Sequence, residues 1–204
     1  MKVVIIGGVA GGASTAARLR RVDEEAEIVM LEKGPYVSFA NCGLPYYLSR
    51  TINEREKLLV TTPESLREML NIDARPNSEV IAIDRAGKSV SIREHGSGRE
   101  YSETYDKLVL APGAEPIVPP LPGVELEGVF ILHNIPELDA LDGYIKAKHV
   151  KHAVVIGGGF IGLEVAENLA ETGVEVTIVE MLNQVMAPVD YEMAVEVHEH
   201  LALH

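Results

Sequence analysis

The chain has 204 residues, with 18 Lys and Arg against 31 Asp and Glu, and a formal net charge of −13. Hydrophobic residues make up 47% of it, enough for a buried core, but no run approaches the roughly 20 apolar residues of a membrane helix. So acidic a chain would repel the phosphates of nucleic acids and anionic membranes. Its single Cys cannot form an internal disulfide. We therefore expect a cytoplasmic protein with no nucleic-acid or membrane partner.

The charge is unevenly distributed along the chain. All 18 basic residues precede residue 152, whereas the 53 residues from 152 onward carry nine acids and no base. At the N-terminus, Lys2 and the apolar residues after it imitate a secretory signal. Arg18, Arg20 and Arg21 follow at once, and the stretch has the pattern of a strand, a turn and a helix, so we do not interpret it as a signal.

The first half of the chain predicts a βαβ unit followed by further strands. In chain order we expect a strand (2–6), a Gly-rich turn (7–12), a helix (13–22), a strand (27–31), a loop that contains the Cys (33–50), a helix started by Thr62-Pro63 (64–70) and strands between 72 and 111. Five prolines within 112–123 then indicate a domain boundary.

The second half repeats the opening pattern. We expect a strand (129–132), a helix (136–148), a strand (153–156), a Gly-rich turn (157–162), a helix (163–171), a strand (174–179) and a helix (190–203). The predicted fold is α/β and three-layered, with two Rossmann-like dinucleotide-binding units. The first domain spans 1–113, and 114–204 is the N-terminal part of a second, incomplete one.

The second Gly-rich turn satisfies the dinucleotide fingerprint G-x-G-x-x-G with Gly157, Gly159 and Gly162. The first glycine permits a tight turn, the second lets the backbone approach a pyrophosphate, and the third lets helix and strand pack closely. Glu180 ends the next strand, where a carboxylate accepts hydrogen bonds from a ribose. Because an acid repels a 2′-phosphate and no base lies nearby, we predict NADH rather than NADPH.

The first turn is an imperfect copy of the second. It reads GGVAGG from Gly7 to Gly12, so that Val9 replaces the middle glycine, and Glu32 closes the following strand. Two such units imply two dinucleotides, and the commonest pairing is a flavin in one and a nicotinamide in the other.

Cys42 lies in the motif SFANCGLPY, ten residues after Glu32. A lone Cys is usually a buried apolar residue. The alternative is a redox thiol beside a flavin. A dithiol enzyme needs a second Cys, and none exists here, but a single thiol can hold a mixed disulfide or persulfide, or become a sulfenic acid.

The order of these motifs, together with YDKLVLAPG at 105–113, resembles the FAD- and pyridine-nucleotide-dependent disulfide oxidoreductases with one active-site Cys. Within them the chain is most similar to coenzyme A disulfide reductases and NADH-dependent persulfide or polysulfide reductases. The resemblance implies that NADH passes electrons through FAD to a catalytic Cys42, which reduces a small-molecule disulfide or persulfide.

The resemblance also implies roles for individual positions. The residues expected to bind FAD or NADH are Gly7, Gly8, Ala10, Gly11, Gly12, Glu32, Lys33, Asn41, Val80, Ala111, Pro112, Gly113, Gly157, Gly159, Phe160, Ile161, Gly162, Glu164 and Glu180. Ser38 and Asn41 would flank the sulfur and face the substrate. Arg18 and Arg21 lie on one face of the first helix, where the usual role is solvated charge; the resemblance favours contact with the phosphates of coenzyme A.

Two other interpretations stay open. An NADH oxidase or peroxidase with a Cys sulfenic acid shares the single-Cys loop, but commonly places a His where this chain has Ala10. A non-catalytic fragment or FAD-binding module is the second, because the family's returning flavin segment and its dimerisation domain are not within these 204 residues. The full-length protein is expected to be a homodimer. The seven His residues form no convincing metal site.

Overall fold

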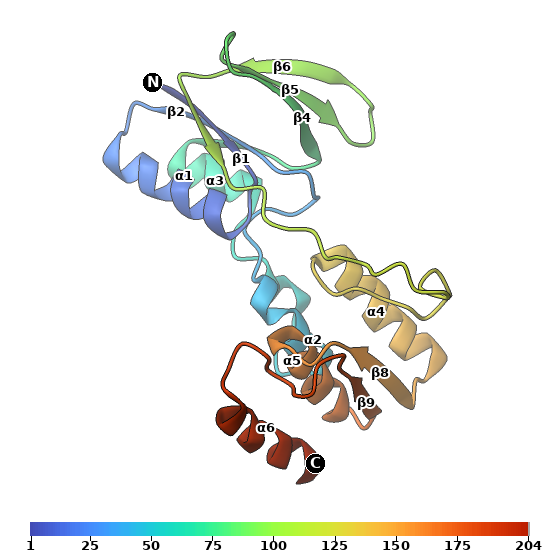
Figure 1. Cartoon of the computed structure of the whole chain (residues 1–204). Coiled ribbons are helices and arrows are strands. Elements are labelled where there is room, and N and C mark those ends of the chain that lie inside the picture. Colours follow the sequence, from blue (N-terminus) through green and yellow to red (C-terminus); the bar gives the residue numbers. More distant parts are fainter. Residues whose placement is uncertain (204) are drawn as a thin grey trace. The chain divides into compact units, whose positions relative to one another are not determined.

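The computed structural model describes residues 1–203, which form two compact units. The first contains residues 1–40 and 56–117, and the second contains 41–55 and the described residues from 118 to 203. The segment that carries Cys42 therefore folds with the second unit, although it lies within the sequence of the first. Figure 1 labels the short helix α2, which follows Cys42 within this segment. The division into domains 1–113 and 114–204 stays a prediction.

The first unit contains a parallel sheet with the strand order β3-β2-β1-β7. Its parts are β1 (Lys2–Ile6), α1 (Ala10–Val22), β2 (Glu27–Leu31), α3 (Pro63–Leu70), β3 (Ile72–Arg75) and β7 (Lys107–Leu110). An antiparallel sheet is formed by β4 (Ser78–Asp84), β5 (Ser89–Glu94) and β6 (Glu100–Thr104). A short 3-10 helix, η2 (Arg55–Leu58), precedes α3. Thr62 caps α3, as the sequence predicts, by accepting a bond from the Ser65 N–H at 3.2 Å.

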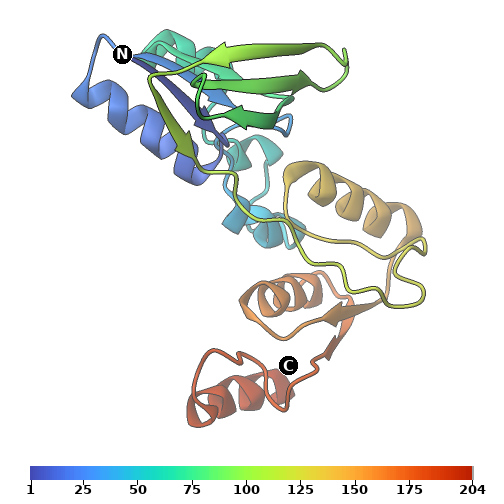
Figure 2. The same ribbon diagram turned by 45° about the horizontal axis from the view of Figure 1, so that its top comes forward.

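Side chains of the central strands alternate between two faces of the parallel sheet, and this explains why the unit has three layers. Successive side chains of a strand point to opposite faces. Val3 and Ile5 of β1 therefore join a core with Ala16 of α1 and Leu66 of α3. Val4 packs in a second core with residues of β5. Both faces of the parallel sheet are thus covered, which Figure 2 shows from a second angle, and the predicted α/β fold class is confirmed.

Over the described residues 41–55 and 118–203, the second unit contains a two-stranded parallel sheet, four α-helices and one 3-10 helix. Its parts are the 3-10 helix η1 (Asn41–Gly43), α2 (Leu44–Leu48), α4 (Ile135–Lys148), β8 (His152–Ile156), α5 (Phe160–Ala170), β9 (Glu175–Val179) and α6 (Tyr191–Leu203). Val154, Ile156 and Val179 are exposed on its two strands. Within residues 1–203, no helix is long and apolar enough to cross a membrane.

For two segments, the expected type of secondary structure is wrong. Residues 41–48 are not loop but form η1 and α2. Residues 129–132 form no strand. Val129 instead donates its N–H to the Leu126 carbonyl in a turn, at 3.2 Å, and the Phe130 ring packs edge-on against Tyr144 of α4 at 5.1 Å. An apolar β-branched run becomes a strand only where a neighbouring strand offers it hydrogen bonds.

Candidate active site

The two Gly-rich turns have nearly the same backbone geometry. Gly7 and Gly157 adopt φ values of +98° and +104°, which side-chain-bearing residues rarely adopt. Each donates its N–H at 2.8 Å to the last residue of the next strand, Leu31 or Val179. The sequence-based assignment of two fingerprints therefore corresponds to two matching strand–turn–helix units.

The last glycine of each turn is required by a close approach of the backbone. A Cβ built on Gly12 would lie 1.7 Å from the Gly7 carbonyl oxygen, and one built on Gly162 would lie 2.0 Å from that of Gly157. The middle position has no such constraint. Val9 and Gly159 have φ values of −92° and −81°, so the valine of the imperfect first fingerprint fits the same backbone.

Each turn is braced by the acid at the end of the second strand. Glu32 accepts hydrogen bonds from the N–H groups of Gly8 and Gly34, both at 2.7 Å. Glu180 accepts them from Gly158 at 2.7 Å and Leu182 at 2.8 Å. The pKa of Glu180 is lowered below its ordinary value by hydrogen bonds from backbone N–H groups. The bond from Leu182 has the larger effect, and the bond from Gly158 follows. Both acids are therefore positioned by the chain itself.

The helices that follow the two turns are open at their N-termini. Neither α1 nor α5 has a side-chain cap or an acid in its first turn. By contrast, the side chains of Thr62 and Asn134 cap α3 and α4. A helix N-terminus with free N–H groups attracts phosphate, and a Cβ at Gly159 would meet no protein atom within 4 Å. The two turns therefore fit the pyrophosphates of two dinucleotides.

The repeat extends further than the fingerprints. Val37 and Val185 are both buried. The residue after each, Ser38 or Met186, has a φ near +50°. Ser38 donates its N–H to the carbonyl of Gly8, and Met186 donates its N–H to that of Gly158. Met186 is not predicted from the sequence, although it stands six residues after Glu180 as Ser38 stands six after Glu32. That equal spacing is the signal that could have found it.

Most of the residues expected to bind the flavin belong to the first unit. A Cβ built on Gly7 would lie only 1.9 Å from the Ala111 carbonyl oxygen. The 111–113 segment therefore passes directly over the first turn. Lys33 is exposed and pairs with Glu115 at 3.2 Å and Glu79 at 3.4 Å; these contacts, with the bond to Glu115 first, raise the pKa of its ammonium group. Val80 lies in β4 beside a bulge.

The residues expected near the nicotinamide lie at the start of α5. Phe160 and Ile161 are exposed in its first turn, 58% and 64%. Glu164 lies one turn further on and is half-buried. An exposed aromatic side chain next to an uncapped helix N-terminus offers an apolar surface beside a phosphate site.

Cys42 lies in the 3-10 helix η1, and it is exposed rather than buried. Its backbone N–H donates to the Asn41 side-chain oxygen at 3.2 Å. Asn41 and Cys42 belong to the second unit, whereas Ser38 belongs to the first. An exposed thiol is accessible to a disulfide substrate. Cys42 is therefore not the buried apolar residue that a lone Cys usually is.

The three arginines of the first helix have different surroundings. Arg18 and Arg21 are exposed, and Arg21 donates to the Ala17 carbonyl at 3.2 Å. Arg20, which the sequence did not single out, donates to backbone carbonyl oxygens of 23, 24, 26, 70 and 71 at 2.5–3.3 Å. Arg20 is thus structural, and Arg18 and Arg21 remain available for a ligand.

Two Gly-rich turns with dinucleotide-fingerprint geometry and one exposed thiol define the class of a two-dinucleotide oxidoreductase. The family model described as pyridine nucleotide-disulphide oxidoreductase matches residues 1–204. The chain belongs to this family.

Two of the matched relatives are named as reductases of sulfur compounds. Coenzyme A disulfide reductase of Staphylococcus haemolyticus is 38% identical over 192 residues, 94% of this chain and 43% of that protein. A crystal structure of reduced Bacillus anthracis CoADR-RHD is 55% identical with a TM-score of 0.97, over 100% of this chain and 37% of that one. An NAD-dependent persulfide reductase from A. fulgidus is 41% identical with a TM-score of 0.93, over 99% and 38%. The chain thus spans less than half the length of these relatives.

A different activity also occurs among the matches. The water-forming NADH oxidase of Lactobacillus brevis, bound to NADH, is 31% identical with a TM-score of 0.90, over 98% of this chain and 44% of that one. An engineered form of it is an NADPH oxidase, in which one substitution replaces an aspartate by alanine and two introduce arginine.

Proposed function

We propose that this chain is the part of an NADH-dependent flavoprotein that carries the reactive thiol, and that Cys42 reduces coenzyme A disulfide, coenzyme A persulfide or polysulfide. The observation that carries the proposal is the exposure of Cys42, the single Cys of a chain with two dinucleotide-binding turns. The names of the Staphylococcus haemolyticus and A. fulgidus relatives support sulfur substrates of this kind.

The residues present fit FAD at the first turn and NADH at the second. Gly7, Gly8, Gly12 and Glu32 would hold the ADP half of the flavin, and Gly157, Gly159, Gly162 and Glu180 that of NADH. Bound flavin would supply two-electron transfer between the nicotinamide and a sulfur.

The preference for NADH rests on the charge around Glu180. Its carboxylate is held at the second turn by two backbone N–H groups, where it would accept bonds from the adenosine ribose and repel a 2′-phosphate. Residues 152–204 contain no Lys or Arg. The engineered Lactobacillus brevis enzyme, which gained arginines and lost an aspartate, supports the same physical argument.

The chemistry of Cys42 is thiol–disulfide exchange. Its thiolate attacks one sulfur of a coenzyme A disulfide, a Cys42–sulfur bond forms, the substrate S–S bond breaks, and one coenzyme A leaves as thiolate. Two electrons from NADH then reduce the mixed disulfide, which returns the Cys42 thiolate and releases the second coenzyme A. Arg18 and Arg21 would attract the phosphates of the coenzyme.

Cys42→Ser tests the proposal in the complete polypeptide. We expect it to abolish NADH-dependent reduction of coenzyme A disulfide, persulfide and polysulfide, because no sulfur remains to form the mixed species. NADH-dependent reduction of ferricyanide, which needs no thiol, should continue at the wild-type rate and is the control. Retention of disulfide reduction by the variant would contradict the proposal.

An oxidase or peroxidase is the second candidate, and the Lactobacillus brevis relative favours it. Such an enzyme would cycle Cys42 through a sulfenic acid. Ala10 offers no acid–base side chain at the start of α1, so we rank this activity lower. Turnover on oxygen and peroxide, measured beside the sulfur substrates, separates the two. A 204-residue chain that purifies colourless and does not oxidise NADH would support a fragment without activity of its own.

A further inference from the structure

Two arginine–aspartate pairs fasten the segment that carries Cys42 to helix α4. Arg50 donates from Nη2 to Oδ1 of Asp142 at 2.5 Å. Arg55 donates from Nε and Nη2 to the two carboxylate oxygens of Asp139, at 2.7 and 2.6 Å. The two aspartates are three positions apart, so they lie on one face of α4. All four residues belong to the second unit.

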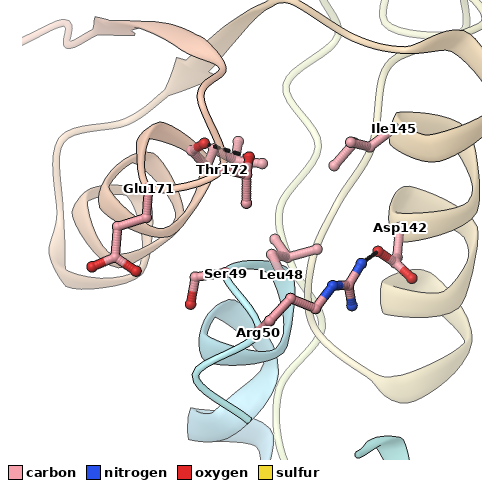
Figure 3. A pocket seen from close by; sticks show the side chains of 8 residues that line it. Leu48, Ser49, Arg50, Asp142, Ile145, Glu171 and Thr172 are labelled. Carbon is pink, nitrogen blue, oxygen red and sulfur yellow. Dashed lines mark hydrogen bonds and ion pairs between the residues drawn. The ribbon is translucent and has the colours of Figure 1, made fainter. Parts of the chain in front are cut away.

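Side-chain packing holds only the first part of this segment. Leu44 and Leu48 of α2 are 2% and 3% exposed, and α2 packs against α5. After Leu48 the contact opens into a cavity of about 340 Å³, whose lining includes Ser49, Arg50 and Thr172 (Figure 3). The end of the segment is tied to α4 by the two ion pairs. Within the segment, the Ile52 N–H donates to the Tyr46 carbonyl at 3.0 Å.

The Arg50–Asp142 pair is the more constrained of the two. The Asp142 side chain is only 11% exposed and also accepts a bond from Lys146 at 2.7 Å. Removing a partner from a largely buried carboxylate is costly, because the remaining charge is poorly solvated. Arg50 adopts a φ of +69°, and its N–H and Nη1 both donate to the Tyr47 carbonyl, at 3.2 and 3.1 Å. Such a backbone conformation persists where its surroundings hold it.

These contacts connect Cys42 to the helix that starts at the second fingerprint. Cys42 lies two residues before α2, and α2 lies against α5, which begins directly after Gly159. We propose that Arg50 and Arg55 are positioning residues, which hold the Cys42 segment in a fixed place within the nicotinamide-binding unit. This inference rests on the proposed function of Cys42. Displacement of a reacting group by about 1 Å can cost 100-fold in rate.

Arg50→Gln and Arg55→Gln, singly and together, test the inference in the complete, flavin-loaded polypeptide. We expect the kcat for coenzyme A disulfide to fall roughly 10- to 100-fold in the double variant. The KM for NADH and the rate of ferricyanide reduction should stay within about twofold of wild type, because neither arginine belongs to the nucleotide site. The charge swap Arg50→Asp/Asp142→Arg should recover most of the kcat lost in Arg50→Gln.

Lys146→Gln is the matched control. It removes one cation from Asp142 but leaves the Arg50 pair in place, so its kcat should stay near that of wild type. A double arginine variant with wild-type kcat would overturn the inference, and so would a parallel loss of ferricyanide reduction, which would show general structural damage. If Cys42→Ser keeps disulfide reduction, the proposed function fails. If Cys42→Ser loses it while the arginine variants keep it, only the positioning role fails.

Discussion

Ser38 donates its backbone N–H to the carbonyl oxygen of Gly8 at 2.8 Å while its own φ is +47°. Met186 makes the same bond to Gly158 at 2.7 Å with a φ of +53°. In both units, the chain that leaves the second strand is thus returned to the Gly-rich turn by a left-handed residue. The first of these returns lies directly before the Cys42 segment.

This geometry predicts how substitutions at Ser38 behave. Ser38→Val should lower the free energy of unfolding by about 1–2 kcal/mol, because a β-branched side chain is crowded in the left-handed region. Ser38→Gly should change it by less than about 1 kcal/mol, since glycine adopts this conformation freely. Urea unfolding of both variants measures the difference, and equal stabilities would contradict the assigned backbone conformation.

The second fingerprint predicts different effects for substitutions of two of its glycines, Gly162 and Gly159. Gly162→Ala places a methyl group against the Gly157 carbonyl oxygen, so it should destabilise the second unit by about 3 kcal/mol. Gly159→Ala meets no protein atom. It should leave the stability within about 0.5 kcal/mol but raise the KM for NADH roughly tenfold, because the methyl group occupies space needed by the pyrophosphate. Thermal unfolding and NADH kinetics on both variants check this. A Gly159→Ala variant with normal KM would argue against nucleotide binding at this turn.

The lowered pKa of Glu180 predicts a particular pH dependence. A carboxyl group whose pKa is depressed on folding stabilises the native state above its ordinary pKa, and this stabilisation is lost as the pH falls through the lower, folded value. Glu180 should therefore stay ionised well below neutral pH, and the KM for NADH should rise only when the pH falls below the ordinary carboxyl value of 4.5.

Glu180→Gln is the comparison for that measurement. Its KM for NADH should be higher than that of wild type and should lack the rise at acidic pH. Its preference for NADH over NADPH should also shrink, because the repelling charge is gone. A wild-type KM that already rises near neutral pH would show that another group governs binding.

The helix α1 predicts different roles for its arginines. Arg20→Met should lower the free energy of unfolding by about 2 kcal/mol, because its guanidinium group bonds several backbone carbonyl oxygens. The double variant Arg18→Ala/Arg21→Ala should leave stability within about 0.5 kcal/mol while raising the KM for coenzyme A substrates. Urea unfolding and substrate kinetics on the same preparations separate the two effects. An unchanged KM in the double variant would remove Arg18 and Arg21 from the substrate site.

Local signals in the sequence predicted most elements of the fold. Helix α3 begins where Thr62-Pro63 predicts it, because the capping bond spans three residues. Helices α1 and α5 begin within the Gly-rich turns, about three residues earlier than predicted, since the glycines take part in the first helical turn. Residues 129–132 do not form the predicted strand, because a strand requires a neighbouring strand as hydrogen-bond partner, and the local sequence does not show whether one is present.

By itself, the sequence determined the geometry of the two Gly-rich turns. A glycine with positive φ, a second glycine against a carbonyl oxygen and an acid one strand later are requirements that neighbouring residues impose on each other. Only the tertiary structure decided where Cys42 belongs. Arg50 and Asp142 are 92 residues apart in the chain, and no periodicity or motif connects them. Their contact depends on how α2, α4 and α5 pack, so it assigns the thiol segment to the second unit although it lies within the sequence of the first.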